Sequence, residues 1–202
     1  MAYIGKTPTP APLTSSDIAN GIVSVDKLTS TLDLSSNTVT LPSGVGGKVL
    51  QVVQATKQDT QDFALSTGTL SDVTGLSASI TPSSSSNKIL VMFTVHIGQN
   101  SGGSANAYIN INRGGSDIFI ANALGSRTRG TSSVGMDMAS QYTMKIANQS
   151  YLDSPSTTSA TTYKLRAGGF NSRDFSVNKT IVDASEGNVA TSTLTLIEVS
   201  AW

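Results

Sequence analysis

The chain has 202 residues, with 13 basic and 13 acidic side chains, no cysteine and a single histidine. The balanced charge argues against duplex DNA or an anionic membrane surface as a partner, because both attract proteins with a basic excess. The absence of cysteine excludes disulfide frameworks, zinc ribbons, thiol nucleophiles and iron–sulfur clusters.

The composition favours β structure. The 31 serines and 25 threonines make up about 28% of the chain, whereas charged residues are only 13%, against about a quarter in ordinary domains. Serine and threonine suit strands and turns, and they compete with the backbone for hydrogen bonds inside helices. We therefore expect an all-β protein.

The first 45 residues differ from the rest. Residues 7–12, which contain three prolines, form an extended segment because proline fixes φ and disfavours a helical conformation in the residue before it. The short apolar groups that follow have no partner element large enough to bury them. We predict that residues 1–45 are an extended N-terminal arm, ordered by packing on identical copies or on a larger surface. A flexible leader is the alternative.

Residues 46–202 show the pattern of one β domain. Apolar and polar residues alternate along most of its segments, and turns rich in glycine, serine and asparagine separate them. About ten strands describe a sandwich or a barrel. The main expected strands are 49–54, 76–80, 88–97, 107–112, 117–121, 136–146, 162–167, 174–178 and 191–199.

Two of these strands are partly apolar on both faces, at 89–97 and 194–199. A sandwich strand normally has one face toward water, so a second apolar face needs a second burial partner. In a single-domain β protein that partner is usually another copy of the chain. The candidates for a subunit interface are Leu90, Met92, Leu194 and Leu196; burial under a long loop is the alternative.

The sequence offers little for catalysis. The only imidazole, His96, lies within a strand, and no nucleophile-elbow sequence is present. The 11 aspartates are scattered without calcium-loop spacing. We expect neither an enzyme nor a bound metal or cofactor. The longest unbroken apolar run, Ile89–Phe93, is far shorter than the ~20 residues of a membrane-spanning helix, so we expect no membrane insertion.

Two glycine-containing loops carry residues that could grip sugars or other polar partners. Arginine and aromatic side chains at loop tips are typical of binding surfaces. The candidate receptor-facing residues are Arg127, Arg129, Phe170, Asn171 and Arg173. The alternative interpretation is that they are solvated turn residues.

Several segments resemble tail-fibre proteins of marine tailed bacteriophages. Residues 2–8, 13–28 and 32–42 are similar to the N-terminal regions of these fibres. In the remainder, residues 84–91, 151–164 and 193–199 are similar to stretches of fibre-tip domains. The stretch from Leu152 to Lys164 is the most specific, and the resemblance covers nearly the whole chain.

The resemblance implies a homotrimeric virion appendage, such as a short tail fibre or spike, made in the host cytoplasm. Its arm would attach to other tail or capsid proteins, and its tip would be a jelly-roll β-sandwich of the tumour-necrosis-factor-like kind. The expected function is attachment to bacterial surface polysaccharide or lipopolysaccharide. Many such fibres are much longer and have a shaft, so a non-adhesive capsid decoration or tail-tip component is the alternative function.

Overall fold

The computed structural model describes residues 48–63, 69–99, 105–136, 142–170 and 174–201, and the predicted N-terminal arm lies outside these ranges. The described residues form strands and no α-helix, as the composition predicts. The strands are β1 (Val49–Lys57), β2 (Gln61–Phe63), β3 (Leu70–Ile80), β4 (Lys88–Gln99), β5 (Ala105–Arg113), β6 (Ser116–Ile118), β7 (Ser132–Met136), β8 (Met144–Asp153), β9 (Thr161–Phe170), β10 (Phe175–Val177) and β11 (Ser192–Val199).

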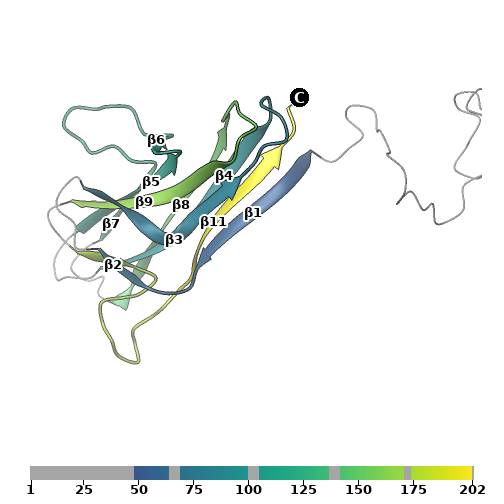
Figure 1. The fold of residues 1–202 in the computed structure, drawn as a ribbon. Helices are drawn as coiled ribbons and strands as arrows, with labels where there is room; N and C mark the ends of the chain where they lie inside the picture. Colours follow the sequence, from purple (N-terminus) through teal and green to yellow (C-terminus); the bar gives the residue numbers. More distant parts are fainter. Residues whose placement is uncertain (1–47, 64–68, 100–104, 137–141, 171–173, 202) are drawn as a thin grey trace, which may run out of the picture. The chain divides into compact units, whose positions relative to one another are not determined.

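The strands pair into two antiparallel sheets that pack as a sandwich (Figure 1). In sheet A, β1 pairs with β11, and β11 and β10 pair in turn with two stretches of one edge of β4. β2 pairs with β10, and β8 pairs with the other edge of β4. Sheet B has the order β3-β9-β5-β6, with β7 also paired to β5. Eight strands have five residues or more. Numbered in chain order, these eight follow 1-8-3-6 in sheet A and 2-7-4-5 in sheet B. This is the strand order of a jelly roll.

One expected strand is in fact two. The sequence predicts a single strand over 136–146, but β7 ends at Met136 in sheet B and β8 begins at Met144 in sheet A. The alternation of methionines continues across both pieces, so the pattern contained no signal for the change of sheet.

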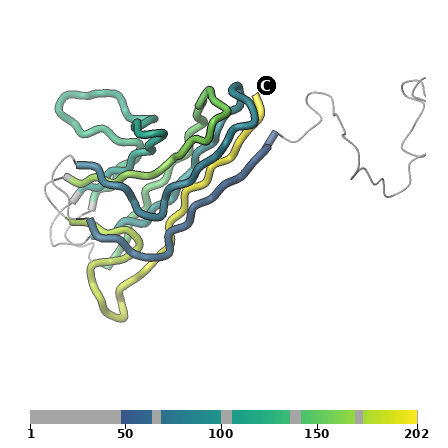
Figure 2. Tube along the Cα trace, in the orientation of Figure 1, coloured from purple at the N-terminus to yellow at the C-terminus, as the bar shows by residue number. Residues whose placement is uncertain are grey.

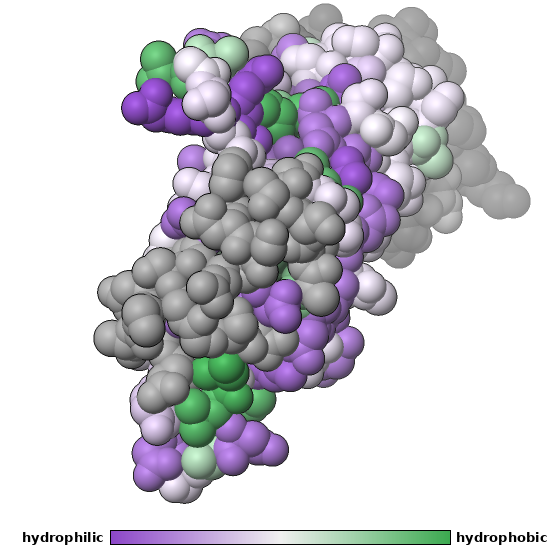
Figure 3. All heavy atoms as spheres, turned by 90° about the vertical axis from the view of Figure 1, so that its left-hand side faces the viewer, coloured by the Kyte–Doolittle hydropathy of each residue, from purple (hydrophilic) through white to green (hydrophobic). Residues whose placement is uncertain are grey.

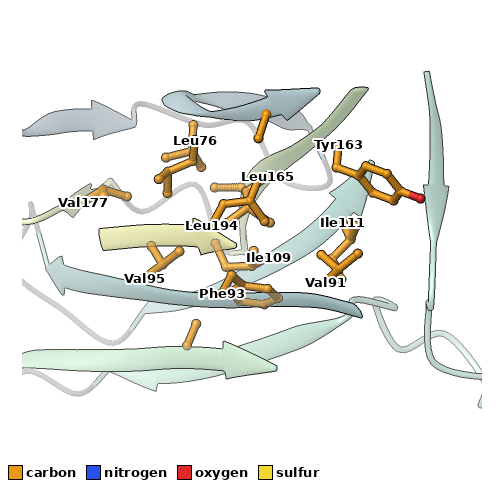
Figure 4. Close-up of a cluster of buried hydrophobic side chains, with 14 of the residues drawn as sticks. Leu76, Val91, Phe93, Val95, Ile109, Ile111, Tyr163, Leu165, Val177 and Leu194 are labelled. Atoms are coloured by element: carbon orange, nitrogen blue, oxygen red, sulfur yellow. The ribbon is translucent and has the colours of Figure 1, made fainter. Parts of the chain in front are cut away.

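The core lies between the sheets and follows the alternation of β4. Ile89, Val91, Phe93, Val95 and Ile97 are all at most 3% exposed. They meet inward side chains of sheet B and of β11 (Figure 4), among them Ile109, Ile111, Leu165 and Leu194. Every second residue of a strand faces the same side. The pairing of neighbouring strands with β4 therefore fixes their phase, that is, which of their two faces points into the core.

A buried asparagine links three strands of sheet A. β11 pairs with β4 up to Thr94, and β10 pairs with β4 from Ile97 onward. Asn178 lies at this change of partner with φ of 67°. Its side-chain amide donates to the carbonyls of Lys57 and Asp59 at 2.9 and 3.0 Å, and its oxygen accepts from the Ser192 hydroxyl at 2.6 Å. Asn178 thus holds β1, β10 and β11 together.

Candidate functional site

A loop of residues 119–131 connects β6 to β7 and projects from the end of sheet B (Figures 1 and 2). Its base is closed by hydrogen bonds. The amide of Ala121 donates to the carbonyl of Gly130 at 3.3 Å, and Nε of Arg129 donates to the carbonyl of Ala121 at 2.7 Å. The turn at the tip is closed by the Arg127 amide, which donates to the carbonyl of Leu124. Gly125, within that turn, has a φ of 59°, which glycine adopts without steric cost.

Both ends of this loop are fastened to the sandwich. Phe119 stacks on Tyr151 of sheet A, with ring centroids 4.3 Å apart. The Thr131 hydroxyl accepts from the amide of Ile111 at 3.2 Å and donates to the carbonyl of Ile118 at 3.3 Å. A loop tied at both ends loses little conformational freedom when a ligand binds.

Between this loop and the strands β5 and β7 lies a cleft of ≈ 620 Å³. Cavities of this size accommodate small ligands. Among the residues that line it, several have polar side chains: Asn106, Tyr108, Ser126, Arg127, Thr128 and Ser133. Figure 3 looks onto the end of the molecule from which the loop projects, where hydrophilic and hydrophobic side chains are interspersed at the top. We refer to this space as the loop cleft.

Tyr108 contributes to the wall of the loop cleft and is 5% exposed. Its ring packs across Gly168 of the neighbouring strand β9, where a Cβ atom would overlap the ring. Burial raises the pKa of the Tyr108 phenol, so it stays protonated over the physiological range. A protonated phenol can donate one hydrogen bond and accept others.

Beside Tyr108, sheet B carries a network centred on Asp117. Its carboxylate accepts from the side chains of Asn110 at 3.0 Å and Asn112 at 2.6 Å, and it pairs with Arg166 at 3.4 Å. Burial raises the pKa of Asp117, but these hydrogen bonds and the Arg166 charge outweigh it and leave the pKa lowered. The sequence pattern predicts solvated asparagines here, whereas both are at most 4% exposed because the network and the loop cover them.

The structure separates the candidate receptor-facing residues. Arg127 lines the loop cleft, whereas the side chain of Arg129 closes the base of the loop. Phe170 ends β9 opposite Asn106, at the rim of the cleft, but its side chain is not among those described. Asn171 and Arg173 lie outside the described residues. Tyr108 was missed because no local signal distinguishes it from an ordinary strand aromatic.

The candidate interface residues also divide. Leu90 and Met92 lie on the outer face of sheet A, and Met92 is 43% exposed. The assignment of Leu194 and Leu196 to a subunit interface is wrong, because both are fully buried in the core of their own chain. β11 pairs with β4 so that these leucines lie beside Phe93 and Val91, which face inward.

On the outer face of sheet A, Leu90 belongs to a row of aliphatic residues that the sequence analysis did not identify. Leu152, Leu90, Ile197 and Val52 are paired in direct register across β8, β4, β11 and β1. We call these four residues the aliphatic row. Among the paired positions of these strands, Lys88 is the only lysine, arginine or acidic residue on this face. Next to the row, at Thr94 of β4 and Thr193 of β11, lies a shallow hollow of ≈ 380 Å³ that is lined mainly by threonine, serine and asparagine residues.

Comparisons with known proteins give likenesses to solved structures alone. No family model and no curated protein matches the chain. Among solved structures, a chain from "Structure of infectious bursal disease virus Gx strain" is similar over 81% of this chain and 42% of that one, with 14% identity and a TM-score of 0.36. This chain therefore spans less than half of that viral chain, and at this TM-score the likeness carries no functional argument. No helix among the described residues is long and apolar enough to cross a membrane.

Proposed function

We propose that this chain is a virion appendage, a short tail fibre or spike, that attaches a bacteriophage to polysaccharide or lipopolysaccharide on its host. The observation that carries the proposal is the loop cleft, a preformed cavity on a jelly-roll domain with hydroxyl, amide and guanidinium groups in its lining. A sugar presents many hydroxyl groups that must regain hydrogen bonds when they leave water. The serine and threonine hydroxyls, the Asn106 amide and the Arg127 guanidinium supply both donors and acceptors. The proposed role is binding without catalysis.

We further propose that the chain acts as a homotrimer that packs through the outer face of sheet A. The aliphatic row gives that face apolar area to bury. The four strands that carry the row hold one charged position on this face, Lys88, so this part of the face can meet its own copy without strong like-charge repulsion. Three copies joined in this way would present three loop clefts. Weak single-site binding then becomes strong attachment through avidity. Residues 1–45 would anchor the trimer to tail or capsid proteins.

Adsorption of phage particles tests the attachment role. Particles that lack this chain should adsorb to host cells several-fold more slowly than complete particles, and purified chain should compete with complete particles for the cell surface. Normal adsorption without the chain, together with labelling of the chain on the capsid shell, would overturn the proposal and favour a capsid decoration.

The mass of the purified protein tests the trimer. Sedimentation should give three times the chain mass, and Ile197→Ser should shift the equilibrium toward the monomer because Ile197 belongs to the aliphatic row. Val189→Ser is the matched control, since Val189 is 78% exposed in the segment between β10 and β11, away from that row. A wild-type monomer at all concentrations, or equal dissociation by both variants, would contradict the proposal.

A further inference from the structure

We infer that the loop cleft binds a negatively charged saccharide, with the acidic group of the sugar paired to Arg127. This inference rests on the proposed attachment function and names the ligand class for the same cleft. It depends on three observations: the state of the Arg127 guanidinium, the absence of acids from the cleft lining, and the kind of groups around it.

The first observation is that Arg127 has no acidic partner among the described residues. Arg113 pairs with Asp153, and Arg166 pairs with Asp117. Arg127, in contrast, is exposed, and its guanidinium contacts only the carbonyl of Leu124, at 3.5 Å. Its donors are therefore available to a ligand. A guanidinium presents paired N–H groups that match a carboxylate or a phosphate in a bidentate arrangement.

The second observation is that no aspartate or glutamate is among the described residues that line the loop cleft. The loop of residues 119–131 contains two arginines and no acid. The acid closest to Tyr108 in the network, Asp117, is already bonded to two asparagines and to Arg166. An anionic ligand in the cleft would therefore meet a positive loop and no unpaired carboxylate, which favours its association.

The third observation is that the remaining lining groups suit a sugar ring. Ser126 and Thr128 lie on the loop, and Ser133, which pairs with Tyr108, lies on β7 across the cleft. Hydroxyls on two facing walls can bond to ring hydroxyls while Arg127 holds the charged substituent. A bare inorganic anion would use Arg127 alone and leave the walls unused, so the cleft is better matched to an acidic sugar.

Isothermal titration of the full chain with three matched oligosaccharides tests the inference. The probes are a galacturonate trisaccharide, the neutral galactose trisaccharide, and a phosphorylated galactose trisaccharide, which together separate carboxylate from phosphate as the source of the charge. We expect at least one acidic probe to bind tenfold or more tightly than the neutral one. That difference should shrink as salt is added, because the pair is solvent-accessible.

Variants locate the binding. Arg127→Ala should reduce acidic-probe affinity at least tenfold, to the level of the neutral probe. Ser133→Glu should do the same by repulsion while Arg127 remains in place. Lys145→Ala removes an exposed cation from β8, outside the cleft, and should leave affinity unchanged. Thermal unfolding of each variant confirms that it folds, and the two cleft variants reach the same outcome by independent routes.

Three outcomes would overturn the inference: equal affinity for neutral and acidic probes, full affinity in Arg127→Ala and Ser133→Glu, or an equal loss in Lys145→Ala. Binding of the wild-type chain to host cells, measured in parallel, separates this inference from the proposed function. Cell binding that is unaffected by Arg127→Ala refutes the cleft and its ligand class but leaves attachment intact. Binding of acidic sugars without any binding to host cells refutes the attachment role.

Discussion

Replacement of Leu194 by alanine tests the packing of β11 directly. Leu194 is fully buried, and it points into the core beside Phe93 and Leu165 (Figure 4). The change removes the equivalent of three buried methylene groups, at about 0.8 kcal/mol each. The unfilled space adds roughly 1–2 kcal/mol, because a sandwich core relaxes only partly. We therefore expect a loss of about 3.5–4.5 kcal/mol in the free energy of unfolding.

Urea unfolding, followed by fluorescence and circular dichroism, measures this loss. The matched control is Thr195→Ala, one residue along the same strand on the outer face, which should change stability by less than about 0.5 kcal/mol. Leu194→Ala should be destabilised at every protein concentration, because its effect lies within one chain. Two results would refute the assignment of Leu194 to the core. One is a decrease in the free energy of unfolding below about 1 kcal/mol, and the other is dissociation of the oligomer while the single chain stays as stable as wild type.

Three further substitutions test other features of the fold. Asn178→Ala should cost about 3 kcal/mol in urea unfolding, because it removes three buried hydrogen bonds and leaves alanine at a positive φ; Asn178→Gly should cost about 1 kcal/mol less, and equal losses would exclude a role for φ. Burial raises the pKa of Glu198, but hydrogen bonds from Asn87 and Ser83 outweigh it and leave the pKa below its ordinary value of 4.5. The stability from this lowered pKa is fully present above about pH 4.5 and is lost as the pH falls through the folded-state pKa. In unfolding measured as a function of pH, the stability advantage of wild type over Glu198→Gln should therefore shrink between pH 5 and pH 3. A stability advantage that does not depend on pH would contradict this. Gly98→Ala should lower stability by roughly 1–3 kcal/mol, because its Cβ would overlap the carbonyl of Lys179, and a melting temperature equal to that of wild type would refute this.

The sequence indicates some residues of each candidate surface, but not which residues the fold brings together. The loop composition indicates Arg127 as a binding residue, but it cannot place that residue opposite Ser133, because the two walls of the cleft come from a loop and a strand that meet only in the folded sheet. Arg129 has the same local signature as Arg127, yet its side chain closes the loop. The difference depends on which carbonyl lies within reach, and that is a property of the tertiary structure.

The sequence alone determined the all-β class and which face of β4 is buried. Every second residue from Ile89 to Ile97 is apolar, whereas the opposite face includes Thr94 and His96, and two-residue periodicity is intrinsic to a strand. It could not determine the phase of β11. In that strand Leu194 and Leu196 lie on one face while Ile197 and Val199 lie on the other, so both phases bury comparable apolar area. Only the pairing of β11 with β4 in the folded sheet decided which face is inside.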